Sequence, residues 1–231
     1  MSTQIIKKDE IEKITINNII DGLTGFITSG KTDYAHTANR LFKSLFAHNF
    51  LNQLQMEWDS YCVKGTVDLD YSSTKPYINS LSELLDYLDS DIPNDEIADT
   101  LKKLFFIPSF RDLLNEDDKL LSIEYMKLVK QLNSGELTVL FTTYKYNNLN
   151  IHNTRSSWDA EKWLNEIAVK SNLKYSELVE VHEKKLMELC LITKRKYEDE
   201  SGIILNNKFR LTNLGYNLCK YIELYNNFKQ D

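Results

Sequence analysis

Glycine, proline and cysteine are scarce in this chain of 231 residues, which contains 7 Gly, 3 Pro and 3 Cys. The small number of turn-forming residues argues for helices over a turn-rich β fold. Cys62, Cys190 and Cys219 are an odd number at no metal-binding spacing, so they predict neither a disulfide framework nor a zinc site. Buried thiols in a reducing cytoplasm are the plain interpretation.

Long apolar runs are also absent, because no stretch approaches the roughly 20 residues that span a bilayer. The opening residues MSTQIIKKDEIEK lack the apolar core of a signal peptide. We therefore expect a cytoplasmic protein with no membrane partner. Hydrophobic residues make up 42% of the chain and charged residues 27%, which suits a packed core and excludes general disorder.

An excess of positive charge is missing too, since the formal net charge is −6. Residues 1–154 contain 15 basic and 22 acidic residues, whereas residues 155–231 contain 13 and 12. A general polyanion binder is disfavoured, but a small basic patch in the second part of the chain stays open.

Apolar residues recur at helical spacing through the first 133 residues. The strongest pattern, at 34–63, is a stripe wide enough to need two neighbouring helices. Shorter helical patterns follow, and Pro93 suits the first turn of one of them. We expect residues 1–133 to form a helical bundle with one long helix at 34–63, along which the chain forms a homo-oligomer.

From residue 134 onward the pattern changes to three helices, a pair of strands and a closing helix. We expect helices near 134–144, 158–170 and 175–190, then a strand at 191–197 and an acidic polar connection at 198–202. Thr212 is expected to cap the last helix, because its hydroxyl can accept from a free backbone N–H there. This order predicts a winged helix with a two-stranded wing at 134–231, in a mainly α-helical protein.

Two short motifs carry a family resemblance. The pattern L-x-x-x-x-L-I at 186–192 and the pattern L-T-x-x-G-x-x-L at 211–218 resemble winged-helix domains of the MarR-like kind. The resemblance implies a fold, and winged helices bind DNA, RNA or other proteins.

The whole chain also resembles an uncharacterised family of bacterial helical proteins associated with prophages and other mobile elements. The resemblance lies in SGKTDYAH at 29–36, LLDYLDSDIPNDEIADTLKKLFF at 84–106 and MKLVKQLNSGELTVL at 126–140. It implies a prophage or phage-defence setting and no particular activity.

Residues 25–32, GFITSGKT, match the phosphate-binding pattern GxxxxGK[ST]. That loop needs a buried strand before it and a parallel sheet around it, and neither is indicated here. The favoured interpretation is a break between two helices at Gly30. A nucleotide-dependent protein that uses residues 25–32 is the weakest of the three function hypotheses.

Other candidate chemistry is weaker. The segment from Asp68 begins like a calcium loop but has Ser73 and Asn79 where Gly and Glu are needed. The four histidines are scattered, with no spacing that argues for catalysis. We therefore expect no enzyme, no catalytic residues, no cofactor and no metal.

Acidic residues crowd the segment between Thr66 and Thr100, which contains nine of them and one lysine. Such a run is typical of a solvated helix face. The sharper hypothesis is a docking surface for a basic partner, or an imitation of nucleic acid, carried by Asp86, Asp89 and Asp91.

The helix expected at 175–190 would enter the major groove if this winged helix read DNA. Four glutamates against two lysines make it a poor groove reader, because carboxylates are repelled by phosphate. The wing is better suited, and its basic residues are the candidate phosphate contacts: Lys194, Arg195, Lys196, Lys208 and Arg210. Our first hypothesis is thus a non-enzymatic protein-interaction or regulatory protein with a protein partner. The alternative is a DNA-binding transcription regulator that uses the wing.

Overall fold

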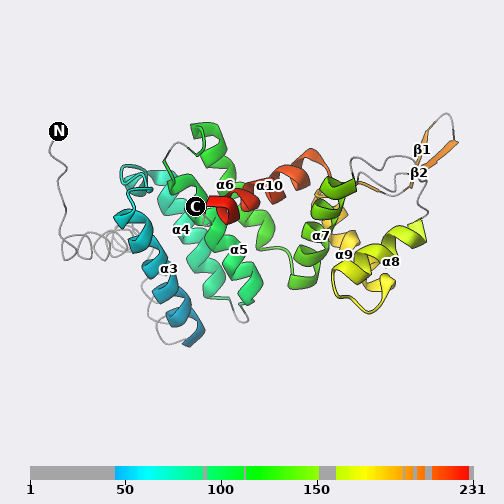
Figure 1. The fold of residues 1–231 in the computed structure, drawn as a ribbon, viewed down its shortest axis with the longest axis horizontal. Helices are drawn as coiled ribbons and strands as arrows, with labels where there is room; N and C mark the ends of the chain where they lie inside the picture. The colour runs from blue at the N-terminus through cyan, green and yellow to red at the C-terminus, as the bar shows by residue number, and fades with distance from the viewer. Residues whose placement is uncertain are drawn as a thin grey trace. The chain divides into compact units, whose positions relative to one another are not determined.

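A computed structural model describes seven segments of the chain: residues 45–90, 93–111, 113–150, 160–194, 196–199, 202–205 and 210–228. These residues are mainly helical, which confirms the mainly α-helical part of the predicted fold class (Figure 1). The chain divides into two compact units, Met1–Lys127 and Leu128–Asp231. The division falls inside helix α6 (Glu116–Val129), a little before the boundary expected after residue 133.

The first unit is built from helices. In chain order they are α3 (Leu45–Val63), the short 3-10 helix η1 (Tyr71–Ser73), α4 (Lys75–Leu88), α5 (Asp95–Phe106), the 3-10 helix η2 (Ile107–Ser109) and most of α6. Helix α3 covers the second part of the helix predicted at 34–63, and residues 34–44 lie outside the described segments. Within those segments no helix combines the length and the apolar character that crossing a membrane requires.

Side-chain caps set the beginnings of α4 and α5. The N–H of Tyr77 donates to Thr74 Oγ1 at 3.4 Å. The N–H groups of Glu96 and Ile97 donate to Asn94 Oδ1 at 3.0 and 3.2 Å. These bonds satisfy backbone donors that have no partner inside the helix. Pro93 therefore precedes the cap and does not lie in the first helical turn as expected.

An aromatic cluster forms the core of the first unit. Trp58 stacks on Phe106 with ring centroids 6.1 Å apart, and Tyr61 meets Phe110 edge-on at 5.1 Å. An isolated antiparallel bridge between Val67 and Phe110 ties the loop after α3 to the end of η2. The apolar stripe predicted for α3 is therefore buried inside its own unit at these aromatic positions.

The second unit has four helices and a β ribbon. They are α7 (Ser134–Asn150), α8 (Ala160–Lys170), α9 (Ser176–Glu188), β1 (Lys196–Asp199), β2 (Gly202–Leu205) and α10 (Asn213–Phe228). Strands β1 and β2 pair antiparallel, with Lys196 opposite Leu205 and Asp199 opposite Gly202. Helix α9 packs on both α7 and α8, and α10 packs on α7 (Figure 1).

The end of α9 differs from the expected strand at 191–197. Cys190 has a left-handed φ of 57°. Its N–H donates to the Met187 carbonyl at 3.0 Å, and the N–H of Leu191 donates to the Leu186 carbonyl at 2.9 Å. This pair of bonds is the Schellman arrangement that ends many helices. Leu191 thus belongs to the helix end, and the strand begins only at Lys196.

The start of α10 agrees with the sequence. The N–H of Gly215 donates to Thr212 Oγ1 at 3.0 Å, which confirms Thr212 as the cap. A Cβ atom at Gly215 would overlap the carbonyl oxygen of Leu191, so a side chain here would force the two segments apart. The chain leaving α9 and the chain entering α10 are thus in direct backbone contact.

Candidate interaction surface on helix α9

The inner side of α9 is spaced for burial. Val179, Glu183 and Leu186 recur every three or four residues, and all three are buried. Val179 and Leu186 are ordinary core residues, but a buried glutamate needs a partner, because an uncompensated charge inside a protein is costly. That partner is Arg210, whose Nη1 lies 2.5 Å from Glu183 Oε2.

The guanidinium of Arg210 also contacts Thr193 and Met187. Nε and Nη2 donate to the carbonyl oxygen of Thr193 at 3.1 and 2.8 Å, and Nη2 lies 3.6 Å from Met187 Sδ. The residue is only 1% exposed. The prediction that Arg210 contacts phosphate is therefore wrong.

The physical reason is that Arg210 lies on the inner side of its segment. A phosphate contact of the wing would have to face solvent. In the structure Arg210 is buried and Leu211 is partly exposed. The buried carboxylate of Glu183 forms an ion pair with the guanidinium, and the carbonyl of Thr193 accepts hydrogen bonds from its Nε and Nη2. Together these interactions compensate the burial of the charge.

The other predicted phosphate contacts are less completely placed. Lys194 is exposed, directly after the isolated bridge that joins Ile192 to Leu211. Lys196 is the first residue of β1. Arg195 and Lys208 lie outside the described segments. Of the five basic residues, the structure therefore leaves one, Lys194, with a described side chain that faces solvent.

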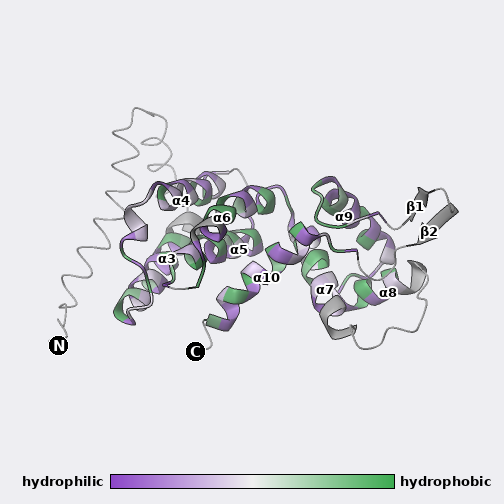
Figure 2. Ribbon diagram, turned by 90° about the horizontal axis from the view of Figure 1, so that it is seen from above, coloured by the Kyte–Doolittle hydropathy of each residue, from purple (hydrophilic) through white to green (hydrophobic). Residues whose placement is uncertain are grey.

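The outer side of α9 has a different character. Leu178 is 41% exposed and Val181 is 58% exposed. Glu177 and Glu180 are exposed beside them. Figure 2 shows hydrophobic and hydrophilic residues together on this helix. We call these four residues the α9 face.

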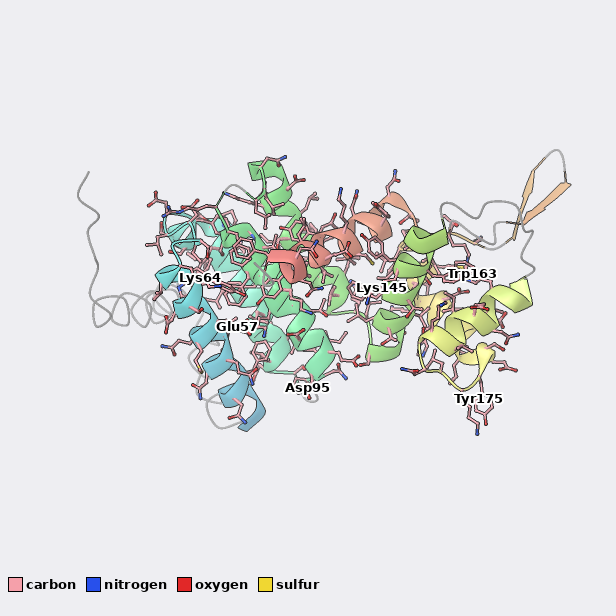
Figure 3. The ribbon with its side chains drawn as sticks, viewed as in Figure 1. Glu57, Lys64, Asp95, Lys145, Trp163 and Tyr175 are labelled. Atoms are coloured by element: carbon pink, nitrogen blue, oxygen red, sulfur yellow. The ribbon has the colours of Figure 1, made fainter. Side chains whose placement is uncertain are left out.

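Single exposed hydrophobic residues are normal on protein surfaces and need no explanation. Leu178 and Val181 are three residues apart, however, so they lie on neighbouring turns of the same helix side. Tyr175, at the beginning of the helix, adds a ring that is 54% exposed (Figure 3). The ammonium of Lys174 lies 5.1 Å from the centre of that ring. Together these residues form an apolar strip bordered by charge.

The predicted acidic docking residues are only partly placed. Asp86 is exposed on α4, and Asp89 is half-buried at the end of the same helix, where its N–H donates to the Leu85 carbonyl at 3.0 Å. Asp91 lies outside the described segments. The structure thus brings two of the three residues to one helix end, and docking there stays a prediction.

Lys102 is the one buried lysine among the described residues, and a buried lysine can be a catalytic group. Its Nζ lies 3.0 Å from Glu57 Oε1 and 3.2 Å from Asp99 Oδ1 (Glu57 is labelled in Figure 3). Burial lowers the pKa of Lys102, but the hydrogen bond and charge of Glu57 and the charge of Asp99 outweigh it, so the pKa is raised. A lysine nucleophile needs a lowered pKa. This lysine is therefore a structural ion-pair partner.

The described segments contain no metal, phosphate or calcium site among the other candidates. No three His, Cys, Asp or Glu side chains gather there in a way that could hold a metal ion. The phosphate-loop match at 25–32 lies outside those segments. Near the failed calcium motif, the N–H of Asp70 donates to Asp68 Oδ1 at 3.1 Å, which is a local turn.

The α9 face was not singled out from the sequence. The sequence does contain a sign of it, because Leu178 and Val181 are apolar but do not share the helical spacing of the buried residues Val179 and Leu186. A single helical pattern does not say which of two apolar stripes faces the core. Comparisons with protein-family models, with curated proteins and with solved structures gave no match to this chain.

Proposed function

We propose that the chain is a non-enzymatic interaction protein whose second unit is a winged helix that binds another protein through the α9 face. The observation that carries the proposal is the exposure of Leu178 and Val181 beside Glu177 and Glu180. Apolar side chains bordered by polar ones are typical of protein-interaction sites. Its role would be regulatory, through the partner that it holds.

The winged-helix assignment rests on the order of elements. Helices α7, α8 and α9, the β1–β2 ribbon and α10 follow one another as the three helices, the wing and the closing helix of that fold. In this assignment α9 is the helix that a DNA-binding member would insert into the major groove. The chemistry of the α9 face therefore distinguishes a protein-binding winged helix from a DNA-binding one.

The chemistry of α9 favours protein over DNA. Groove-reading helices present arginine, lysine, asparagine or glutamine to base edges and phosphates. Glu177 and Glu180 would instead meet phosphates with like charge, and Leu178 and Val181 offer no hydrogen bond to a base edge. Arg210 is already engaged by Glu183.

The competing proposal is a transcription regulator that contacts phosphate through the wing. It now depends on the exposed Lys194 together with Arg195, Lys196 and Lys208. A few lysines and arginines at a ribbon are enough for weak, salt-sensitive contacts with the DNA backbone.

The test of the proposed function compares proteins captured by two variants. L178S/V181S removes the apolar strip of the α9 face, and L120S/L121S removes two exposed leucines of α6 as a matched control. We expect proteins captured from the cells that encode the chain to be lost with L178S/V181S and kept with L120S/L121S, at equal thermal stability. Equal capture by both variants would show that the α9 face does not bind the captured proteins.

A further inference from the structure

The exposed charges of α9 are divided along the helix. Glu177 and Glu180 lie in its first half, and the exposed Lys184 lies in its second half. Lys185 follows and pairs at 3.7 Å with Glu188, the exposed last residue of the helix, so the net charge of the second half is that of Lys184. Val181 lies between the acidic half and the basic half.

The helix itself does not account for this division. The helix dipole stabilises a glutamate in the first turn and a lysine in the last turn, which explains Glu177 and Lys185. It does not explain Glu180 and Lys184, which lie outside those two turns. Glu180 and Lys184 are four residues apart, a spacing at which they could pair along the helix. Yet neither side chain makes an ion pair within the described segments. Both charges therefore face outward beside the apolar strip.

A surface with this division is complementary to itself. When two copies of one helix pack antiparallel, the acidic half of each lies against the basic half of the other. If the two α9 helices cross level with residue 182, Glu180 of each copy lies opposite Lys184 of the other. The two Val181 side chains then meet near the symmetry axis, with Leu178 along one edge. A two-fold interface requires this self-complementarity.

We propose that the partner of the α9 face is a second copy of this chain, bound through an antiparallel, two-fold α9–α9 contact. The proposal rests on the proposed function, since it names the protein that the α9 face binds. It differs from the oligomer expected along 34–63, because it places the contact in the second unit. The strip is small, so the contact is a weak and concentration-dependent one.

Sedimentation of the full chain over a range of concentrations measures its self-association. Variants that exchange the charges of Glu180 and Lys184 test whether the α9–α9 contact is responsible. Because the contact is two-fold, residue 180 of each copy lies opposite residue 184 of the other. Either single variant, E180K or K184E, therefore creates two pairs of like charges across the interface. We expect each to weaken association by about tenfold or more, which corresponds to about 1.4 kcal/mol. The double variant E180K/K184E restores opposite charges and is expected to recover association to near the wild-type constant. K220E makes the same charge change at an exposed site on α10 and should leave association unchanged.

The outcomes separate the two proposals. A chain that stays monomeric at several hundred micromolar overturns the self-association, and so does a double variant no better than the single ones. If the chain is monomeric but L178S/V181S still loses captured proteins, the α9 face binds a different protein and the proposed function stands. As a second measurement, V181C in a C190S background should form a disulfide-linked dimer under mild oxidation. The same change at Lys220, K220C, should not.

Discussion

The guanidinium of Arg210 and the carboxylate of Glu183 lie 2.5 Å apart with almost no exposure to solvent. The pair joins the inner side of α9 to the segment that leads into α10. Through Nε and Nη2, Arg210 also holds the carbonyl of Thr193, at the point where the chain leaves α9. A basic residue that sequence alone would place on a DNA surface is therefore an internal anchor of the second unit.

Breaking this pair should destabilise the protein strongly. Glu183→Ala leaves the guanidinium buried without its carboxylate, which typically costs about 3–5 kcal/mol. Arg210→Met should cost a similar amount, because Glu183 is then buried without a cation. Urea unfolding followed by circular dichroism measures both changes.

The matched control is Glu180→Ala, which removes an exposed carboxylate from the same helix. We expect it to change the free energy of unfolding by less than about 0.5 kcal/mol. The double variant E183L/R210M should recover much of the loss, because an apolar pair leaves no buried charge. If Glu183→Ala costs no more than Glu180→Ala, the buried pair is contradicted.

Gly215→Ala should destabilise the protein although it lies in a helix. In an open helix this change would stabilise by about 1 kcal/mol. Here the new Cβ overlaps the Leu191 carbonyl oxygen, which belongs to the backbone and moves only with its segment. We expect a net loss of about 2 kcal/mol in unfolding free energy, as for other overpacked sites.

Gly135→Ala is the companion experiment. The atoms that its Cβ would meet belong to the ring of His182, the end of a side chain that can rotate away. Thermal denaturation should therefore show a smaller loss for Gly135→Ala than for Gly215→Ala. The reverse order would contradict the close approach of α10 to Leu191.

Cys190→Gly should stabilise the end of α9. Cys190 adopts a φ of 57°, which costs a residue with a Cβ about 1–2 kcal/mol. Glycine removes that cost but loses more chain entropy on folding, so the expected net gain is about 0.5 kcal/mol. Cys190→Ala keeps the Cβ and should give no gain. Chemical denaturation of the two variants side by side distinguishes strain from the loss of the thiol.

The thiol of Cys62 should make stability fall at alkaline pH. Burial, helped by the charge of Asp59, raises the pKa of Cys62 from 9.0 to about 11. The folded state therefore holds this proton more tightly than the unfolded state. The resulting stabilisation is complete below pH 9 and is lost as pH rises towards 11, by at most about 2 kcal/mol.

The variant Cys62→Ala isolates that contribution from the lysines and tyrosines that titrate in the same range. The difference in unfolding free energy between the wild type and Cys62→Ala should shrink between pH 9 and pH 11. A constant difference over that range would show that the thiol keeps its ordinary pKa in the folded state.

Duplex DNA should bind weakly or not at all. Fluorescence anisotropy with mixed-sequence duplex and the full chain, at low salt and at about 200 mM, measures this directly. The exposed Lys194 and its basic neighbours give at most a weak signal that salt removes. Tight binding that drops in Arg195→Ala or Lys208→Ala would favour the transcription-regulator alternative.

Much of the helical structure could be predicted because it depends on local pattern and capping. Thr212 was identified as a cap from its position between a strand-like and a helix-like pattern, and its hydroxyl accepts from Gly215. Pro93 is expected in the first turn of a helix but lies before the cap, because the sequence does not say that Asn94 rather than an earlier residue supplies the cap. The strand expected at 191–197 starts late, because a left-handed Cys190 ends α9 with a motif usually made by glycine.

The candidate site was harder to predict because it depends on which side of an element faces the core. A phosphate-binding Arg210 would be exposed, but a glutamate 27 positions earlier in the chain binds it inside the unit. Such a pair depends on tertiary proximity and leaves no mark in local periodicity. Leu178 and Val181 are apolar like Val179 and Leu186, and only packing shows that the first two are exposed and the last two are buried.

Site-specific photo-cross-linking from the α9 face tests whether this surface binds protein. A photoreactive phenylalanine analogue at position 178 reports what touches this surface in the cell, and the same analogue at Lys220 provides the background. We expect protein adducts at position 178 well above those at 220, including a dimer of the chain itself if the α9 helices pair. Adducts to nucleic acid at position 178, or protein adducts no more frequent than at 220, would contradict this expectation.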